Sequence, residues 1–526
     1  DDKGRTLSVN KSNQPDVDWL IFGLSATLLA LVVLPVVLFP EASQSAINAI
    51  FKVLTTQFGV LYVTLTNAII VLLLYIAISP WGNIRLGRIE ARYSQFSWIS
   101  MLFCCGIGGS VIYWGATEWV YYYTSPPFGA LAKSDAATLW AQTYGMFHWG
   151  PSGWALYCLP TVAICCTYYL KKIPSLRLSA ACEPIIGKQS NGLGGRIIDL
   201  LFIVGLISSA ATGLGFGTSV AASALTRLMS IPDNFITQLT IITVMTLVIA
   251  GSVYRGLDGG IKTLSNINSV LALLLIAYVL IAGPTRFILE MSVASLGHLA
   301  QNFVTMLTWT DPLEKGNFVE SWTVFYWAWW LALGPFVGMF VCKISEGRTL
   351  RELIVGMLFW GSAGCALFFL ILGNYALNTE LTGLHGVVNE TLNASPSAAL
   401  ATLIERLPAG GFWLAFLAII GIIFTATTYD SASYTLAAGA TVKLEPGEHP
   451  ARWHRVFWAI ALGILPASLL YLGGLKALQT ASVIASLPLL VVYGILFAAI
   501  IRTLRAVDDA STAQNASGFS GEQPAE

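Results

Sequence analysis

The sequence predicts an all-α integral membrane protein with about twelve membrane-spanning helices, and two observations carry that prediction. The chain of 526 residues is 56% hydrophobic and only 11% charged, whereas about a quarter of the residues in a soluble domain are charged. Its apolar residues also gather in runs of about 20, which is the length of a helix that crosses a bilayer. This composition excludes a nucleic-acid binder with a basic face, a disordered chain and an ordinary soluble enzyme.

Twelve apolar runs are predicted as spans, meaning helices that cross the membrane. They are residues 18–39, 58–79, 95–123, 141–170, 194–228, 235–253, 264–283, 320–343, 350–373, 411–438, 454–473 and 476–501. The stretch 286–312 carries Arg286 and Glu290 among apolar residues and is predicted as an amphipathic helix at the membrane interface. Segment 395–407 is predicted as a shorter surface helix of the same kind.

Lys and Arg residues gather in the loops that follow the even-numbered spans. Arg85, Arg88 and Arg92 follow the second span, and Arg348 and Arg351 follow the eighth. The intervening loops hold few basic residues and several acidic ones. Because cytoplasmic loops carry an excess of Lys and Arg, the even-numbered loops and both termini are predicted to face the cytoplasm.

Two predicted spans are interrupted near their middle. The third contains Gly-Ile-Gly-Gly-Ser at 106–110, and the eighth meets Gly334 and Pro335. Lipid cannot satisfy the backbone groups that glycine and proline free, so such segments must line a cavity or pack on protein. Close packing through small residues is the alternative explanation for either break taken alone. Two breaks five spans apart are typical of secondary transporters built from inverted repeats, although 95–283 and 320–501 show no residue-level similarity.

Aromatic residues gather on the fourth and eighth spans. The fourth carries Trp149, Trp154 and Tyr157, and the eighth carries a Trp-rich run ending at Trp329 and Trp330, near its centre rather than at an interface. Indole faces attract quaternary ammonium groups. No carboxylate is at hand in the sequence, and a cation without N–H donors gains little from a buried acid. The pattern indicates either a site for a trimethylammonium or dimethylsulfonium group or simple aromatic packing.

Short motifs on these two spans are specific enough to carry a family resemblance. Residues 325–330 read Phe-Tyr-Trp-Ala-Trp-Trp, 335–340 read Pro-Phe-Val-Gly-Met-Phe and 147–150 read Phe-His-Trp-Gly. They resemble the signature of the betaine/carnitine/choline transporter (BCCT) family over roughly residues 18–500. Within that family, residues 121–129 and 473–480 look most like the carnitine-exchanger branch.

The resemblance implies an architecture. Two leading helices precede a five-plus-five inverted repeat of the LeuT-like type, in a multi-pass protein of the bacterial inner (cytoplasmic) membrane that is usually a homotrimer. The implied divisions are an N-terminal tail, the leading helices, the first repeat, the interfacial helix, the second repeat and a C-terminal tail, at 1–17, 18–79, 95–283, 286–312, 320–501 and 506–526.

A box of five aromatic residues is what the resemblance implies for substrate binding. Its members are Trp149, Trp154, Tyr157, Trp329 and Trp330. The family has a further aromatic wall one turn after the Trp pair, where this chain has Leu333, so we expect the box to be open on that side. Trp322 and Phe325 are expected to form a second, transient aromatic site on the same helix.

Sodium is the coupling ion that the resemblance implies, and no other cofactor is expected. The implied ligands are Cys104, Ile107, Phe424, Thr427 and Thr428, with Ser208 and Thr212 at a second sodium site. Hydrogen bonding to their own helix is the ordinary role of such threonines. Sodium-independent carnitine exchangers instead carry an arginine where Asn268 stands and a methionine where Val337 stands. Both substitutes are missing, so the sequence favours sodium coupling.

The resulting hypothesis is sodium-driven uptake, by alternating access, of a compact methylated onium compound. Betaine, choline, carnitine, dimethylsulfoniopropionate and a methylamine remain open, and the alternative is a sodium-independent carnitine/butyrobetaine exchanger. The expected partners are that small molecule, sodium, the lipid bilayer and two further copies of the chain, with no nucleic acid. A membrane enzyme needs clustered ligands that five scattered histidines do not supply. Glu118 is expected near the outer mouth, and His148 to lack an acidic partner for a proton relay.

Overall fold

The structure, a computed structural model, describes residues 16–106, 108–255, 260–313, 316–442, 449–473 and 475–519. Within these ranges the chain is almost entirely helical, and its extended pairings are two isolated β-bridges, Val17 with Thr441 and Arg85 with Thr349. The all-α prediction is confirmed at this level. Tail 1–17 lies almost wholly outside the described residues, as does the end of tail 506–526.

The first half of the chain is a series of long helices joined by short turns. Its elements are α1 (Trp19–Leu38), α2 (Pro40–Ile78), η1 (Pro80–Asn83), α3 (Gln95–Cys105), α4 (Gly109–Thr124), α5 (Asp135–Trp149), α6 (Pro151–Cys165), η2 (Cys166–Leu170), α7 (Leu178–Ala181), α8 (Glu183–Ile186), η3 (Gly187–Asn191), α9 (Leu193–Leu228) and α10 (Phe235–Arg255).

The second half adds three one-turn π-helical segments to the one in the first half, and such segments often occur at functional sites. Its elements are α11 (Gly260–Ala282), α12 (Thr285–Thr308), η4 (Val319–Thr323), α13 (Val324–Ile344), α14 (Leu350–Gly356), η5 (Met357–Gly361), α15 (Ser362–Phe368), η6 (Phe369–Gly373), α16 (Asn374–Leu381), α17 (Val387–Asn393), α18 (Pro396–Glu405), α19 (Gly410–Gly439), α20 (Arg452–Gly473), α21 (Leu475–Ser486) and α22 (Leu489–Phe519). The π turns are η2, η4, η5 and η6, the first of them already in the first half.

Each of the twelve predicted spans falls on one or more of these helices. In the described part of the chain, nine helical stretches are long and apolar enough to cross a membrane, and up to eleven spans result if two bent pairs count as one each. The pairs are α3 with α4, bent by 57°, and α11 with α12, bent by 110°. The predicted number of twelve and the inverted repeat stay predictions.

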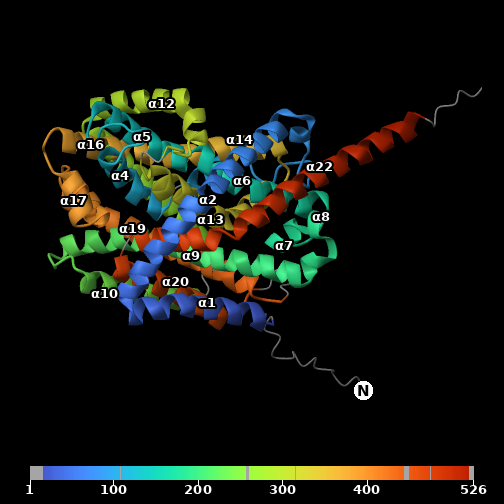
Figure 1. Cartoon of the computed structure of the whole chain (residues 1–526), viewed down its shortest axis with the longest axis horizontal. Coiled ribbons are helices and arrows are strands. Elements are labelled where there is room, and N and C mark those ends of the chain that lie inside the picture. Colours follow the sequence, from blue (N-terminus) through green and yellow to red (C-terminus); the bar gives the residue numbers. More distant parts are fainter. Residues whose placement is uncertain are drawn as a thin grey trace, which may run out of the picture.

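Apolar side chains cover the outside of the molecule as well as its inside. Leu31 of α1, Val71 of α2 and Val248 of α10 expose 64%, 66% and 67% of their surface. A soluble monomer rarely exposes contiguous apolar surface of this kind, whereas lipid covers it at no cost. Figure 1 shows α1 and α12 at opposite edges of the helical body, and α22 running out of it.

The loops that follow even-numbered spans meet one another on one face. The Arg85 guanidinium donates to the Gly347 carbonyl at 2.8 Å, and Arg88 pairs with Glu346 at 3.1 Å, which joins the second loop to the eighth. The N-terminal segment reaches the tenth loop, because the Asp18 N–H donates to the Ala440 carbonyl at 2.9 Å.

The loops that follow odd-numbered spans meet on another face. Arg227, at the end of α9, pairs with Glu390 at 2.9 Å and with Glu405 at 2.8 Å. Tyr278, at the end of α11, stacks on Trp413 at the start of α19, with ring centroids 4.1 Å apart. The fold therefore sorts the loops into the same two sets as the distribution of basic residues.

The predicted break at Gly334 and Pro335 is wrong, because α13 runs through both residues. Proline lacks the N–H that would bond to the carbonyl four residues earlier, on Leu331. The Tyr493 hydroxyl of α22 supplies the donor instead, at 2.9 Å from the Leu331 oxygen. The same hydroxyl lies 3.1 Å from the carbonyl oxygen of Leu156, which Pro160 frees in α6. The two carbonyls that the prolines free thus share the single donor hydrogen of Tyr493, and both helices continue.

The two shorter predicted helices have different outcomes. The stretch 286–312 contains the half-exposed helix α12, turned sharply away from α11, and its interfacial position stays a prediction. The stretch 395–407 contains α18, but residues 397–404 are buried against neighbouring helices. The prediction of a surface helix is therefore wrong, because small residues such as Ser397 let α18 approach α9, where its hydroxyl lies 3.0 Å from that of Ser223.

Candidate functional site

The fourth predicted span is interrupted at Gly150, a break that we did not predict. α5 ends at Trp149 and α6 begins at Pro151. Pro151 cannot donate to the Phe147 carbonyl, so the Ser152 hydroxyl donates to it. The next freed carbonyl, on His148, accepts a hydrogen bond of 2.9 Å from the indole N–H of Trp330. The break of one helix is thus capped by an aromatic residue of another.

A glycine makes this approach possible. A Cβ atom on Gly153 would lie 2.4 Å from the His148 oxygen and 2.9 Å from Nε1 of Trp330, closer than such atoms pack. The Gly-Pro pair at 150–151 was the signal for this break in the sequence. The same Gly-Pro signal at 334–335 led to the incorrect prediction of a break, because there the Tyr493 hydroxyl donates to the carbonyl that the proline frees.

The five aromatic residues of the predicted box form one connected group. Trp329 and Trp330 stack with centroids 4.7 Å apart, and Trp149 meets them edge-on at 5.8 and 4.8 Å. Tyr157 meets Trp330 at 5.5 Å and Trp154 at 5.4 Å. All five are more than nine-tenths buried. Because α5, α6 and α13 hold them, the break at Gly150 and the crossing of α6 with α13 fix their positions.

Leu333 lies on α13 one turn beyond Trp329 and is only partly buried. The second predicted aromatic pair does not come together, since the described residues show no ring contact between Trp322 and Phe325. Trp322 packs on Tyr121 of α4 at 5.0 Å, whereas Phe325 stacks behind Trp329 at 5.6 Å. The expectation of one shared site for these two residues is therefore unsupported by their ring geometry.

A carboxylate lies against the box, contrary to our expectation of an uncharged one. Glu118 of α4 is fully buried rather than at an outer mouth. Its carboxylate accepts hydrogen bonds from the Trp149 indole at 3.0 Å and from the hydroxyls of Tyr122 and Tyr326, each at 2.5 Å. The sequence hid this contact because Glu118 and Trp149 are far apart along the chain. An ionisable residue within an apolar span was the available signal.

His148 also has the acidic neighbour that the sequence did not reveal. Its Nδ1 atom lies 3.9 Å from the Glu118 carboxylate and 3.0 Å from the Tyr122 hydroxyl, while Nε2 lies 3.1 Å from the hydroxyl of Thr323. The His148 side chain is completely buried. Glu118, Tyr122 and His148 therefore form one polar network beside the aromatic box.

The predicted break in the third span is confirmed, and it lies beside a predicted sodium ligand. α3 ends at Cys105 and α4 begins at Gly109. A Cβ atom on Gly109 would lie 3.6 Å from the Cβ atom of Phe424 in α19. Ile107 lies outside the described residues, and Cys104 is partly buried near the end of α3. The structure thus brings the break and α19 together.

The threonines of the predicted sodium site lie on α19. The Thr427 hydroxyl donates within its own helix, at 2.9 Å to the Ile423 carbonyl and 3.2 Å to that of Phe424. A hydroxyl that donates keeps its lone pairs, so this bond leaves the oxygen able to face a cation. Thr428 is partly exposed. These contacts leave both coordination and ordinary back-bonding open, and the sodium site stays a prediction.

Ser208 and Thr212 lie one turn apart on α9, as expected. The Ser208 hydroxyl is buried and has no hydrogen-bond partner among the residues that the structure describes. The Thr212 hydroxyl lies 2.9 Å from the Ser208 carbonyl oxygen and 3.2 Å from the Ser482 hydroxyl of α21. A buried hydroxyl without a partner is costly unless something else satisfies it, and a cation would do so.

The two positions that distinguish exchangers hold neutral side chains in buried places. Asn268 of α11 is fully buried and donates to the Ile420 carbonyl of α19 at 3.3 Å. Ile420 lies one turn before Phe424, so Asn268 is close to the predicted sodium ligands of α19. Val337 lies on α13 and is also buried.

Comparisons with known proteins agree with these features. The family described as "BCCT, betaine/carnitine/choline family transporter" matches residues 20–509. This chain belongs to the betaine/carnitine/choline transporter family. This BCCT transporter is 36% identical to the uncharacterized transporter YeaV of Escherichia coli K12 over 437 residues, which cover 82% of this chain and 90% of the relative.

Two relatives of this BCCT transporter carry substrate names. A carnitine transporter of Acinetobacter baumannii is 34% identical over 418 residues, covering 79% of this chain and 76% of the relative. The glycine betaine transporter OpuD of Bacillus subtilis is 33% identical over 496 residues, covering 93% and 94%. The resemblance drawn from the motifs is confirmed, and the protein is a membrane transporter of this family rather than an enzyme.

Proposed function

We propose that this BCCT transporter takes up a compact methylated onium compound by sodium-coupled alternating access. The observation that carries the proposal is the connected box of Trp149, Trp154, Tyr157, Trp329 and Trp330, backed by a buried carboxylate. Indole faces bind quaternary ammonium groups without needing hydrogen-bond donors on the ligand. The substrate class therefore includes betaine, carnitine and choline types, dimethylsulfoniopropionate and methylamines.

The Glu118 carboxylate would strengthen the binding of a substrate that carries positive charge. The Glu118 carboxylate accepts a hydrogen bond from the Trp149 indole N–H. A charged acceptor makes such a hydrogen bond stronger, and it also places negative charge next to the indole ring. A ligand cation against the other ring faces would gain from both the indoles and this charge. We infer that a cationic head is bound more tightly than a neutral isostere.

Binding requires the rings to move. Trp329 and Trp330 are in direct contact, with centroids 4.7 Å apart, and Trp149 contacts both. A cation binds over a ring face within about 6 Å of the ring centroid. Rings that are already packed on one another leave no space for a cation between them. Separation of α5 and α6 from α13 would admit the substrate, and their return would enclose it.

Sodium coupling is proposed on three grounds. The break after Cys105 lies beside Phe424, and Asn268 supplies no positive charge in place of the ion. The Ser208 hydroxyl is buried and finds no hydrogen-bond partner within the described part of the chain. Sodium bound by Cys104, Ile107, Phe424, Thr427 and Thr428 would then tie the broken third span to α19. Ser208 and Thr212 would hold a second ion.

The proposed architecture follows the family. Twelve spans would comprise two leading helices and a five-plus-five inverted repeat, assembled as a homotrimer in the bacterial inner membrane. Both termini would be cytoplasmic, because Asp18 and the basic loops share one face of the molecule. Inward movement of sodium would then draw on the membrane potential.

Proteoliposome uptake tests the proposal. A panel of labelled onium compounds is offered with an inward sodium gradient, and again with potassium in place of sodium. We expect accumulation only with sodium. Counterflow of carnitine against internal butyrobetaine without sodium would instead favour the exchanger, and failure of every onium compound to be transported would overturn the aromatic box as a substrate site.

A further inference from the structure

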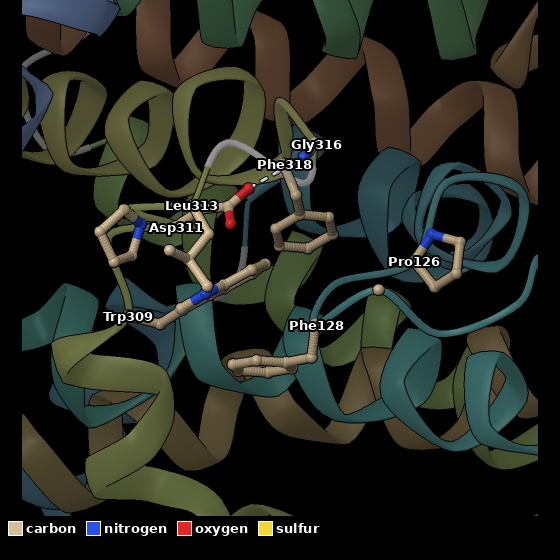
Figure 2. A pocket seen from close by; sticks show the side chains of 9 residues that line it. Pro126, Phe128, Trp309, Asp311, Leu313, Gly316 and Phe318 are labelled. Carbon is tan, nitrogen blue, oxygen red and sulfur yellow. Dashed lines mark hydrogen bonds between the residues drawn. The ribbon is translucent and has the colours of Figure 1, made fainter.

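Polar side chains near the starts of α1 and α20 lack the hydrogen-bond partners that buried groups normally have. Figure 2 illustrates the normal case, in which Oδ2 of the buried Asp311 accepts the Gly316 N–H at 3.0 Å. Leaving a buried donor or acceptor without a partner is costly. In the described part of the chain, no partner exists for the Ser25 hydroxyl, both ring nitrogens of His454, Nε of Arg455 and Nε1 of Trp458.

These side chains gather around one ring of α1. The Phe22 centroid lies 5.2 Å from that of His454 and 5.8 Å from that of Trp458, and Ser25 is one turn further along α1. On α20, residues 454, 455 and 458 fall within about 100° of the helix circumference, so Arg455 shares this side of the helix. Figure 1 shows α1 and α20 side by side.

The atoms without partners are mainly hydrogen-bond donors. A guanidinium and an indole can only donate, a hydroxyl can donate once, and an imidazole carries at least one N–H. Arg455 also carries positive charge, exposes only 8% of its surface and forms no ion pair with a described residue. A water molecule could accept from these donors, but it could not balance a buried charge. The group therefore favours an anion.

The carboxylate at the start of α1 is engaged elsewhere. Asp18 accepts the Ile21 N–H at 3.2 Å through Oδ1, and its Oδ2 atom lies 4.0 Å from Arg196. Asp18 thus balances Arg196 and not Arg455. The start of α20 adds partial positive charge of its own, because the first N–H groups of a helix point out of its end.

Exposed aromatic rings place this site at the membrane surface. Trp19 and Trp453 stand at the starts of α1 and α20, expose 66% and 42% of their surface, and stack with centroids 5.9 Å apart. Exposed tryptophans gather at the level of the lipid headgroups. Phosphate groups lie at that level, and an arginine beside a helix N-terminus is well suited to bind one.

We propose that the starts of α1 and α20 form a binding site for a phosphate group. The Arg455 guanidinium is its charged ligand, and the indole N–H of Trp458, the imidazole of His454 and the Ser25 hydroxyl are its neutral donors. A bound phosphate would tie α1 to α20. The inference does not rest on the proposed function, since neither helix carries a residue of the aromatic box or of the predicted sodium sites.

Binding of labelled phosphatidylglycerol to the delipidated full chain in detergent tests the proposal. We expect one saturable equivalent for the wild type and a dissociation constant raised about tenfold or more in Arg455→Gln, which loses a charge-assisted hydrogen bond. Arg505→Gln is the matched control, because it removes the same charge from an exposed position of α22, and it should bind as the wild type does. Equal losses in the two variants would overturn the site, since surface charge alone would then explain the binding.

A second variant guards against misfolding of Arg455→Gln. Trp458→Phe keeps an aromatic ring and removes the N–H, and it should raise the dissociation constant about threefold. Trp114→Phe is its control, because Trp114 of α4 is equally buried and its N–H also has no partner in the described part of the chain. Unchanged binding in both Arg455→Gln and Trp458→Phe would overturn the proposal.

The phosphate could belong to a phospholipid headgroup or to a soluble phosphate. Competition with inorganic phosphate separates these sources. Displacement of the labelled lipid by millimolar phosphate would support a soluble ligand, and its retention would support the headgroup. Equal displacement by diacylglycerol, which has the acyl chains but no phosphate, would overturn the proposal, and so would the absence of saturable binding.

Discussion

Glu118 changes the chemistry expected of the aromatic box. The residue is fully buried and bonded to one indole and two phenol hydroxyls, which is enough to hold a carboxylate in a low-dielectric place. Sequence motifs identified the rings, since they lie within two short stretches of the chain, 149–157 and 329–330. They could not place Glu118, because only the packing of α4 against α5 brings it to Trp149.

We expect Glu118→Gln to weaken binding of a cationic onium more than that of its zwitterionic counterpart. The amide keeps hydrogen-bond acceptors but removes the negative charge, and losing about 1–2 kcal/mol of attraction weakens binding roughly tenfold. Competition binding of choline and glycine betaine to the purified transporter measures both affinities.

Asp199→Asn is the control for that experiment. Asp199 is also a buried carboxylate, but it accepts its hydrogen bonds from Ser179 and lies outside the box network. We expect both affinities to stay as in the wild type. Equal losses for choline and betaine in Glu118→Gln would mean that Glu118 supports the fold and does not select charge.

The Thr427 hydroxyl distinguishes sodium binding from helix back-bonding. Thr427→Val removes that oxygen at nearly constant volume, and loss of one ligand should raise the sodium concentration for half-maximal uptake about tenfold or more. Uptake at graded sodium concentrations measures this. Thr435→Val, which removes a similarly back-bonded hydroxyl on the same helix, should change nothing. Identical behaviour of the two variants would contradict the sodium site.

At the scale of helices, one tyrosine keeps two proline-containing helices continuous. Pro160 in α6 and Pro335 in α13 each free a carbonyl, and the Tyr493 hydroxyl of α22 lies within hydrogen-bond distance of both. The hydroxyl occupies a space that only Gly334 leaves open, because a Cβ atom there would lie 2.2 Å from it. α22 therefore joins the two helices that carry most of the box.

We expect Tyr493→Phe to destabilise the protein by about 1–3 kcal/mol, because two buried carbonyls lose their donor. The midpoint of thermal unfolding in detergent should fall, and transport should fall with it as α6 and α13 shift. Tyr144→Phe serves as the comparison, since its buried hydroxyl makes no hydrogen bond within the described part of the chain. An equal effect of the two variants would contradict the role of Tyr493.

The positions of the helices could largely be predicted, whereas only one of their interruptions, at 106–110, was predicted correctly. Apolar runs of span length predict the helix positions, and every such run lies on one or more helices. The sequence signals at Gly150–Pro151 and Gly334–Pro335 are alike, yet only the first breaks the helix. The difference lies in long-range partners, Trp330 at the break and Tyr493 at the continuous helix, which local sequence does not contain. The burial of α18 had the same kind of cause.

At the scale of the whole molecule, charge and packing divide the loops in the same way. Ion pairs of Arg88 and Arg227 join loops only within their own set, on separate faces. The loops that follow odd-numbered spans would therefore lie outside the cell if the basic loops face the cytoplasm. The side on which an onium compound first meets the protein thus depends on orientation.

Cysteine labelling of cells decides that orientation. We expect a membrane-impermeant thiol reagent to label Leu131→Cys in intact cells and Ile89→Cys only after permeabilisation, because these residues are 78% and 87% exposed in an odd-numbered and an even-numbered loop. The parent chain, whose native cysteines are buried or partly buried, is the control and should remain unlabelled in intact cells. Labelling of Ile89→Cys alone in intact cells would contradict the predicted orientation and place the loops that follow even-numbered spans outside the cell.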